Sequence, residues 1–298
     1  MNATGAQARF SVPNGVVYDK NDVAYVADEG NKVIRKVARD GSVTTWGSGV
    51  TLTAPYSVTV DDALNVYVLD RLAAGIAVVK INSAGAMSTV TLTGVTFTNS
   101  NPRGLAVTGD GTSLFLADAN NLRKFNLATG AQSATITTGL LGVNGIVTAA
   151  DGVYWVEFTS HTVKKAGLDL SAPVVVAGIA SSKGFVDGAG ASVARFNQPV
   201  ALALAKDASG NATKIYVVDQ GNHALRVIDR TAGDTVSTLA GKLDTTLATG
   251  LPGLLAALPG TLSATGTAGL YFPKGIGINS LGDLLISTSD GLMQVTAP

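Results

Sequence analysis

The stretch Val26-Ala27-Asp28-Glu29-Gly30-Asn31-Lys32-Val33-Ile34-Arg35-Lys36-Val37 decides the fold, because the chain repeats it. A second copy runs from Val217 to Ile228, and a third, one residue tighter, runs from Leu116 to Phe125. Weaker copies begin at Val68 and Trp155. A unit that recurs about every 40 to 50 residues indicates a repeat architecture, in which neighbouring units bury each other's faces.

Each repeat reads as four short strands separated by turns rich in Gly, Asp and Asn. In the first repeat these strands are Pro13–Asp19, Val23–Asp28, Val33–Val37 and Val43–Trp46. The pattern restarts at Ala54, Asn101, Val143, Gln198 and Phe272. Radial repetition of four-stranded units leaves only short, protected sheet edges. The sequence therefore predicts an all-β fold, a six-bladed β-propeller of four-stranded antiparallel blades, as a single domain over residues 1–298.

A connector between repeats carries a family resemblance. Gly188–Pro199 precedes the Val-Asp-x-Gly-Asn-His-x-x-Arg unit and Thr238–Gly241, and Gly5–Pro13 is a second copy of this connector. Together these motifs resemble the NHL-repeat β-propeller family over essentially the whole chain. The resemblance implies six blades whose first strands line a central channel. Repeats two, four and six depart from the motif, at Arg71 to Gly75, Phe158 to His161 and Ser287 to Gly291.

Closure of the ring is open at this point. The last repeat offers three strands, Ile276–Asn279, Leu284–Thr288 and Leu292–Val295, and lacks a fourth. The last blade is then either three-stranded or closed by an N-terminal latch from Asn2 to Ala8. A third alternative is an open sheet edge that another chain completes, because edge strands present unpaired N–H and C=O groups.

Composition narrows the classes of partner. Lys+Arg and Asp+Glu number 21 each, so no global charge attracts nucleic acid, and aromatic residues are only 6% of the chain. No apolar run reaches the roughly 18 to 20 residues of a membrane-spanning helix. There are no cysteines, which excludes disulfides and thiolate metal sites. The N-terminus shows no signal peptide, yet the Ala/Gly/Thr/Ser-rich composition favours a secreted or otherwise extracytoplasmic protein.

Five carboxylates recur at the end of the second strand of successive repeats. Gathered on one face they could form a cation site or an acid/base pair. Asp before Gly-Asn also commonly accepts N–H bonds from its own tight turn. Recurrence favours this structural role, because a catalytic residue needs to be placed only once. The candidates for a ligand-binding role are Asp28, Asp70, Asp118, Glu157 and Asp219.

The two histidines join this candidate set. His161 and His223 follow Glu157 and Asp219 by four residues, at equivalent places in adjacent repeats, where repeat one has Lys32. Equivalent positions of adjacent blades lie side by side, so a two-histidine metal site is geometrically feasible. Because Lys occupies this position in repeat one, the position is more simply explained as the solvent-exposed start of a strand. The sequence therefore predicts no catalytic residue, no metal ligand and no cofactor; Ca²⁺ is the ion that the carboxylates would suit.

A leucine-rich segment is the most unusual part of the chain. Pro-Gly pairs flank Leu-Leu-Ala-Ala-Leu in a connector longer than the NHL resemblance implies. One or two helical turns of this length do not stand alone in water. The leucines either pack on the propeller itself, dock a partner as an apolar patch, or form a lid. The candidate partner-binding residues are Leu251, Leu254, Leu255 and Leu258.

These observations favour a non-enzymatic interaction scaffold that binds a protein or a surface glycan. One alternative is a metal-dependent propeller lactonase or lyase-type enzyme, which would need non-repeating polar residues on its first strands. Those strands are mostly apolar, as in Val200–Ala205, although polar residues remain near strand ends at Asp19, Asp61, Asn144 and Asn279. The other alternative is a self-associating structural subunit completed by strand donation between chains.

Overall fold

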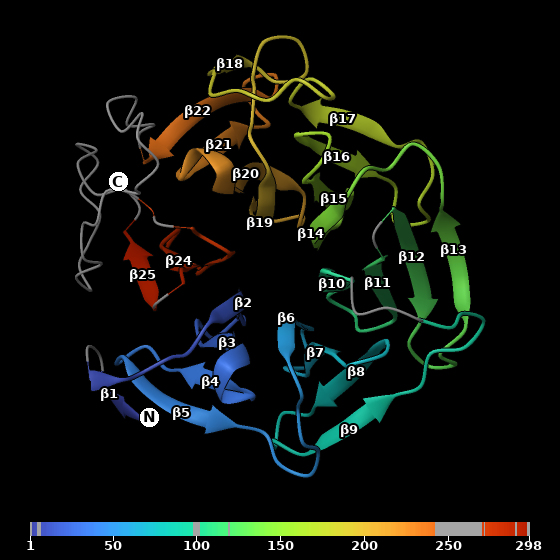
Figure 1. Ribbon diagram of the computed structural model, residues 1–298, viewed down its shortest axis with the longest axis vertical. Helices are drawn as coiled ribbons and strands as arrows, with labels where there is room; N and C mark the ends of the chain where they lie inside the picture. The colour runs from blue at the N-terminus through green and yellow to red at the C-terminus, as the bar shows by residue number, and fades with distance from the viewer. Residues whose placement is uncertain are drawn as a thin grey trace.

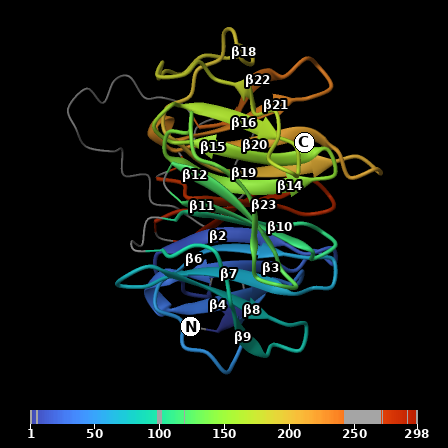
Figure 2. The ribbon, with the colours of Figure 1, turned by 90° about the vertical axis from the view of Figure 1, so that its right-hand side faces the viewer.

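Six antiparallel sheets surround a central axis in the computed structural model (Figure 1). The structure describes residues 2–4, 7–97, 102–118, 120–241, 270, 272–289 and 291–296. Seen from the side, the sheets stack above one another and their inner strands run along the axis of the ring (Figure 2). The predicted all-β, six-bladed propeller is therefore confirmed.

Blades 1 to 5 each contain four consecutive strands, ordered from the axis outward. Blade 1 comprises β2 (Pro13–Tyr18), β3 (Ala24–Asp28), β4 (Val33–Val37) and β5 (Ser42–Trp46). Blade 2 comprises β6 (Pro55–Val60), β7 (Val66–Arg71), β8 (Ile76–Ile81) and β9 (Met87–Val90). Blade 3 comprises β10 (Gly104–Val107), β11 (Ser113–Asp118), β12 (Asn121–Asn126) and β13 (Gln132–Ile136).

The second half of the ring follows the same plan. Blade 4 comprises β14 (Val143–Ala149), β15 (Gly152–Glu157), β16 (Thr162–Ala166) and β17 (Val174–Ala177). Blade 5 comprises β19 (Pro199–Lys206), β20 (Ala212–Asp219), β21 (Ala224–Asp229) and β22 (Thr235–Ala240). Blade 6 has three strands among the described residues: β23 (Gly275–Ile278), β24 (Leu284–Ser287) and β25 (Leu292–Val295).

Neighbouring first strands approach each other closely at one recurring position. A Cβ added at Gly15 would lie 2.9 Å from the Cα atom of Ser57, and one at Gly145 would lie 2.8 Å from that of Ala201. No larger side chain fits so close to a neighbouring backbone. The equivalent position of every repeat therefore holds a small residue: Gly15, Ser57, Gly104, Gly145, Ala201 and Gly275.

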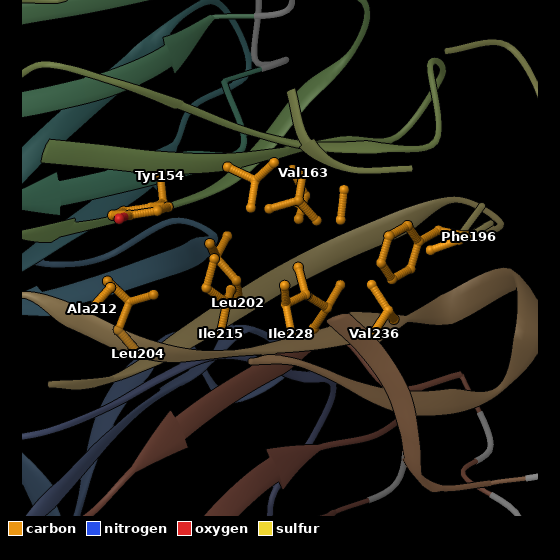
Figure 3. Close-up of a cluster of buried hydrophobic side chains, with 14 of the residues drawn as sticks. Tyr154, Val163, Phe196, Leu202, Leu204, Ala212, Ile215, Ile228 and Val236 are labelled. Atoms are coloured by element: carbon orange, nitrogen blue, oxygen red, sulfur yellow. The ribbon is translucent and has the colours of Figure 1, made fainter. Parts of the chain in front are cut away.

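Hydrophobic side chains fill the spaces between adjacent blades. Between blades 4 and 5, Tyr154 and Val163 of one sheet meet Leu202 and Ile228 of the next, with Phe196 of the connector closing the outer side (Figure 3). Further clusters of the same kind lie between other blades. Burying each such side chain contributes about 1.5–3 kcal/mol. The radial stacking of sheets is therefore the main source of stability.

The N-terminal strand does not close the last blade. β1 (Ala3–Thr4) pairs antiparallel with β5, with Ala3 opposite Val43, and so adds a fifth strand to blade 1. β18 (Gly188–Ala189) pairs with β22 of blade 5 in the same way. The segment before each first strand thus covers the outer edge of its own blade in blades 1 and 5. Of the alternatives left open for blade 6, the three-stranded blade holds among the described residues, and the N-terminal latch from Asn2 to Ala8 does not, because β1 pairs with β5.

Side chains join the last blade to the first. The backbone N–H and the Oγ–H of Ser280 donate to the two carboxylate oxygens of Asp22, each at 2.7 Å. At the other end of β23, the Ser287 hydroxyl donates to the carbonyl oxygen of Asn14. Leu285 packs among buried side chains of blade 1. The ring is therefore closed by contacts between two blades and not by a strand that they share.

Replacing Asp22 with Asn tests this clasp. The hydrogen bonds from Ser280, with help from Arg39, lower the pKa of Asp22 below its ordinary 3.8. A lowered carboxyl pKa stabilises the fold above the unfolded value, and this stability is lost as pH falls through the folded value. We expect Asp22→Asn to lower the free energy of unfolding by about 1.5 kcal/mol at pH 7. In urea denaturation the difference from wild type should be constant above about pH 5 and shrink as pH falls below 3.8 towards the folded pKa of Asp22; a difference independent of pH would contradict the clasp.

Candidate functional site

The recurring carboxylates hold the connector that precedes their own blade. In blade 1 the backbone N–H of Ser11 donates to Asp28 at 2.7 Å, and the Asn31 amide donates to its other oxygen at 2.8 Å. In blade 5 Asn197 N–H and the Asn222 amide make the same two bonds to Asp219, each at 2.7 Å. We call this arrangement the connector clamp. Its donors come from the connector upstream as well as from the turn that the sequence indicated.

The clamp also explains the Gly and the Asn that recur in the Asp-x-Gly-Asn motif of this chain. The Gly after the Asp lies against the connector: a Cβ at Gly30 would lie 2.8 Å from the carbonyl oxygen of Ser11. Gly221 meets Asn197 in the same way, at 2.7 Å. The Asn of the motif is the amide donor of the clamp. Each letter of Asp-x-Gly-Asn therefore follows from the packing of connector against blade.

The weaker repeats vary the same arrangement. In blade 2, Thr53 and Ala54 N–H groups donate to Asp70. In blade 4, the longer Glu157 accepts from Leu141 N–H at 3.3 Å and from the Ser160 hydroxyl at 2.6 Å. In blade 3, Asp118 pairs with Arg123 at 3.5 Å. Blade 6 has no carboxylate here; Ser287 Oγ accepts from Gly275 N–H at 2.8 Å.

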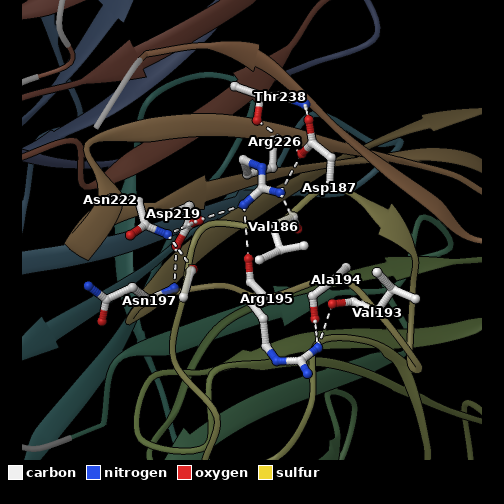
Figure 4. A network of polar contacts seen from close by, with 11 residues as sticks. Val186, Asp187, Val193, Ala194, Arg195, Asn197, Asp219, Asn222, Arg226 and Thr238 are labelled. Carbon is white, nitrogen blue, oxygen red and sulfur yellow. Dashed lines mark hydrogen bonds and ion pairs between the residues drawn. The ribbon is translucent and has the colours of Figure 1, made fainter. Parts of the chain in front are cut away.

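Blade 5 adds a fully buried arginine to its clamp (Figure 4). Arg226 donates to Asp219 at 3.1 Å and to Asp187 at 2.5 Å, and also to the carbonyl oxygens of Val186 and Arg195. Its guanidinium lies over the ring of Phe196. Burial raises the pKa of Asp219 to about 6, although these hydrogen bonds oppose the rise. Burial also raises the pKa of Asp70, against its backbone donors.

The two carboxylate partners of Arg226 offer a matched pair of variants. Both side chains of the Arg226–Asp219 pair are fully buried, whereas Asp187 is 50% exposed. Removing a buried partner leaves an uncompensated charge, so we expect Asp219→Ala to lower the free energy of unfolding by about 3–5 kcal/mol. Asp187→Ala should cost no more than about 1 kcal/mol. Guanidinium denaturation at pH 8, where Asp219 is ionised, checks both values; equal effects would contradict a clamp centred on Asp219.

The histidines contact the connector that leads into the following blade. His161 Nδ1 accepts a hydrogen bond from Gln198 N–H at 3.0 Å, and burial lowers its pKa. The ring of His223 meets Phe272 edge-on, with centroids 5.1 Å apart. Both histidines have left-handed backbones, as Lys32 has at the same position of blade 1. Within the described ranges, no group of three or more His, Cys, Asp or Glu could hold a metal ion.

The structure does not describe the candidate leucines. Leu251, Leu254, Leu255 and Leu258 lie outside the described residues. Their predicted role in binding a partner stays a prediction.

A channel runs along the axis of the propeller. Its cavity of about 560 Å³ is lined by the first strands β2, β6, β10, β14, β19 and β23. We call the end where the connectors enter the connector mouth, and the end where the first strands turn into the second strands the turn mouth. The lining of the connector mouth includes one residue per blade just before the small residue: Asn14, Tyr56, Arg103, Asn144, Val200 and Lys274.

Polar residues at the turn mouth cap their own turns. Asp19 accepts backbone N–H bonds from Asn21 and Val23, at 2.8 and 3.0 Å. Asp61 accepts from Asn65 N–H at 2.8 Å, and Asn279 accepts from Leu281 and Asp283 N–H groups. Three of the four polar residues noted near strand ends are thus occupied within their turns. The fourth, Asn144, lies at the opposite mouth.

The backbone aims one residue of each blade at the connector mouth. In four blades the pairing of first and second strands shifts at this point, leaving Asn14, Tyr56, Asn144 and Val200 within a β-bulge. A bulge leaves its extra residue outside the ladder and redirects its side chain. The fold therefore repeats this device in four blades, while the residue that it presents is Asn in two of them, Tyr in one and Val in one.

The side chains of this ring are an aromatic, two amides and two cations beside one valine. Arg71 covers one face of Tyr56, with its guanidinium 4.0 Å from the ring centroid, and pairs with Glu29 of blade 1 at 3.2 Å. Asn14 donates to the same Glu29. Asn144 is 3% exposed, and no described residue is hydrogen-bonded to its side chain. These groups can recognise a polar ligand by hydrogen bonds, charge and contact with a ring.

Sequence reasoning identified only Asn144 among these residues. The signal for the others was nevertheless present in the segments Pro13-Asn14-Gly15, Pro55-Tyr56-Ser57, Pro102-Arg103-Gly104 and Pro273-Lys274-Gly275. Each triplet begins with Pro and ends with a small residue, Gly or Ser, whereas the middle residue differs from one triplet to the next. That contrast identifies a position that the fold leaves free.

Comparison with solved structures agrees with the fold. A structural genomics protein of unknown function from Bacteroides thetaiotaomicron is 19% identical, with a TM-score of 0.73 over 99% of this chain and 71% of its own. An auxiliary nutrient binding protein from Bacteroides ovatus is 16% identical, with a TM-score of 0.72 over 96% and 70% of the two chains. Virginiamycin B lyase from Staphylococcus aureus is 12% identical, with a TM-score of 0.59 over 99% and 97%.

No family model and no curated protein matches the sequence. Among the described residues, no helix has the length and apolar character needed to cross a membrane.

Proposed function

We propose that this chain is an extracytoplasmic, NHL-type propeller that binds a saccharide at the connector mouth of its channel, without catalysing a reaction. The observation that carries the proposal is the ring of six equivalent positions at the channel mouth that hold five different residue types. A residue that only builds the blade recurs, as the clamp carboxylates do. A position whose residue varies from blade to blade is free to match an asymmetric ligand.

The size and chemistry of the channel support a small polar ligand. A cavity of 560 Å³ falls within the range of about 300–1,000 Å³ typical of small-molecule sites. A concave mouth admits the end of a glycan chain more readily than the flat surface of a globular protein. Amides and cations suit a hydroxyl-rich ligand, and Tyr56 offers an apolar ring face to one side of a sugar. The similarity in fold to nutrient binding proteins agrees with this assignment.

The alternatives use other parts of the molecule. A metal-dependent lactonase or lyase-type enzyme would need carboxylates to hold its cation, whereas Asp28, Asp70 and Asp219 are engaged by backbone N–H groups. A self-assembling subunit would use the outer edge of β25, which has no fourth strand beside it among the described residues. A protein partner would use the leucine segment, which remains a sequence-based prediction.

Removing divalent cations separates the enzyme from the binding module. Because the clamp carboxylates are bonded to the backbone, we expect dialysis against EDTA to leave the melting temperature unchanged, and addition of Ca²⁺ to have no effect. A ligand that binds only the folded state stabilises it by mass action. A rise in melting temperature that saturates with Ca²⁺ would therefore support the cation-dependent alternative.

Truncating Tyr56 tests the binding site itself. Neutral and acidic oligosaccharides are titrated into the protein by calorimetry, and Tyr56→Ala is expected to weaken binding about tenfold, or about 1.4 kcal/mol, because the apolar ring face is lost. Leu281→Ala is the control: this side chain is 75% exposed and lies outside the channel lining. The proposal fails if no saccharide binds, or if Tyr56→Ala binds as well as wild type while remaining folded.

A further inference from the structure

The two mouths of the channel carry opposite charge. At the connector mouth the charged lining residues are both cationic, Arg103 and Lys274, contributed by blades on opposite sides of the ring. At the turn mouth the lining contains four acidic residues and two lysines: Asp19, Asp22, Asp61, Asp62, Lys20 and Lys206. A channel with low-dielectric walls focuses the field of such groups. In a chain of zero formal net charge, this separation directs an anionic group to the connector mouth.

Arg103 and Asn144 lie next to each other in this mouth. The first strands of blades 3 and 4 are in contact here, since a Cβ at Gly104 would collide with the carbonyl oxygen of Asn144. Arg103 is exposed, and no described carboxylate forms an ion pair with it. The neighbouring Asn144 is nine-tenths buried and has no hydrogen bond to its side chain from the described residues. Asn144 lines the channel, so its amide is available to a ligand there.

The other cation near this mouth is already neutralised. Arg71 pairs with Glu29 at 3.2 Å and lies on the face of Tyr56. This pair positions the aromatic ring and adds no net charge. Arg103, which forms no ion pair with a described carboxylate, and Asn144 are therefore the donors that this side of the mouth offers to a ligand.

We propose that the saccharide bound at the connector mouth is acidic, and that its carboxylate is held by the Arg103 guanidinium with the Asn144 amide as a second donor. The inference rests on the proposed function and names its ligand class. A guanidinium presents two parallel N–H groups that match the two oxygens of a carboxylate. Tyr56 contacts the sugar ring. The acidic residues at the turn mouth would repel the ligand carboxylate if the saccharide entered from that end.

The test compares acidic sugars with their neutral counterparts. D-glucuronate and D-galacturonate are titrated by NMR or calorimetry beside D-glucose and D-galactose, with sodium phosphate and sodium sulfate as simple anions. We expect the uronates to bind about tenfold more tightly than the neutral hexoses, and this preference to shrink as NaCl is raised. Arg103→Gln should abolish the preference and leave the neutral sugars unaffected. Asn144→Ala should weaken uronate binding with a smaller salt effect.

The control removes a cation from the other end of the same channel. Lys20 lines the turn mouth and is exposed, so Lys20→Gln should retain uronate binding. Equal binding of uronates and hexoses, or loss in Lys20→Gln as large as in Arg103→Gln, overturns the acidic-sugar inference and leaves the saccharide function intact. Phosphate or sulfate binding as tightly as the uronates reduces the site to a general anion site and overturns it too. Failure of every sugar to bind overturns the proposed function itself.

Discussion

The hydrogen bonds that the second-strand carboxylates of blades 1, 2, 4 and 5 accept from the incoming connector are the constraint on which the rest of the structure depends. A connector must cross from the outer edge of one blade to the inner strand of the next, and its backbone N–H groups leave sheet pairing on the way. Buried donors of this kind need an acceptor. Asp28 and Asp219 supply it from the end of the strand that lies beside the crossing. The clamp thereby fixes where each first strand begins, and so fixes the residue that reaches the channel.

Blades 6 and 1 are joined in a different way from the other pairs of neighbouring blades. Within the ring, each connector is covalently continuous with both blades that it joins. Blades 6 and 1 are instead joined by packing and by hydrogen bonds, of Ser280 with Asp22 and of Ser287 with the carbonyl of Asn14. The N-terminal strand β1 does not supply a fourth strand to blade 6, because it pairs with β5 at the outer edge of blade 1. The outer edge of β25 and the contact between blades 6 and 1 are consequently where this propeller differs most from its own repeat.

The sequence predicts the fold well because the fold repeats. Strand length, turn residues and the Asp-x-Gly-Asn letters each recur, and every copy strengthens the same conclusion. Two features could not be obtained this way. The clamp bonds join Asp219 to a residue 22 positions upstream, and local turn chemistry indicates only the nearby Asn222. The closure of the ring depends on whether β1 pairs with β5 or with β25, and both strands present free edges to it. Long-range pairing of this kind is not encoded in a local pattern.

Sequence reasoning missed most of the candidate site because the residues of the site do not repeat. Repetition draws attention to Asp28 and its equivalents, yet repetition is the mark of a structural requirement, since every blade needs the same bond. The positions that can serve a ligand are those where the backbone is the same and the side chain is not. Tyr56 and Arg103 occupy one such position in neighbouring blades. A six-fold scaffold thus becomes an asymmetric binding surface through one residue in each blade, with the positive charge of Arg103 at one mouth and the carboxylates of the turns at the other.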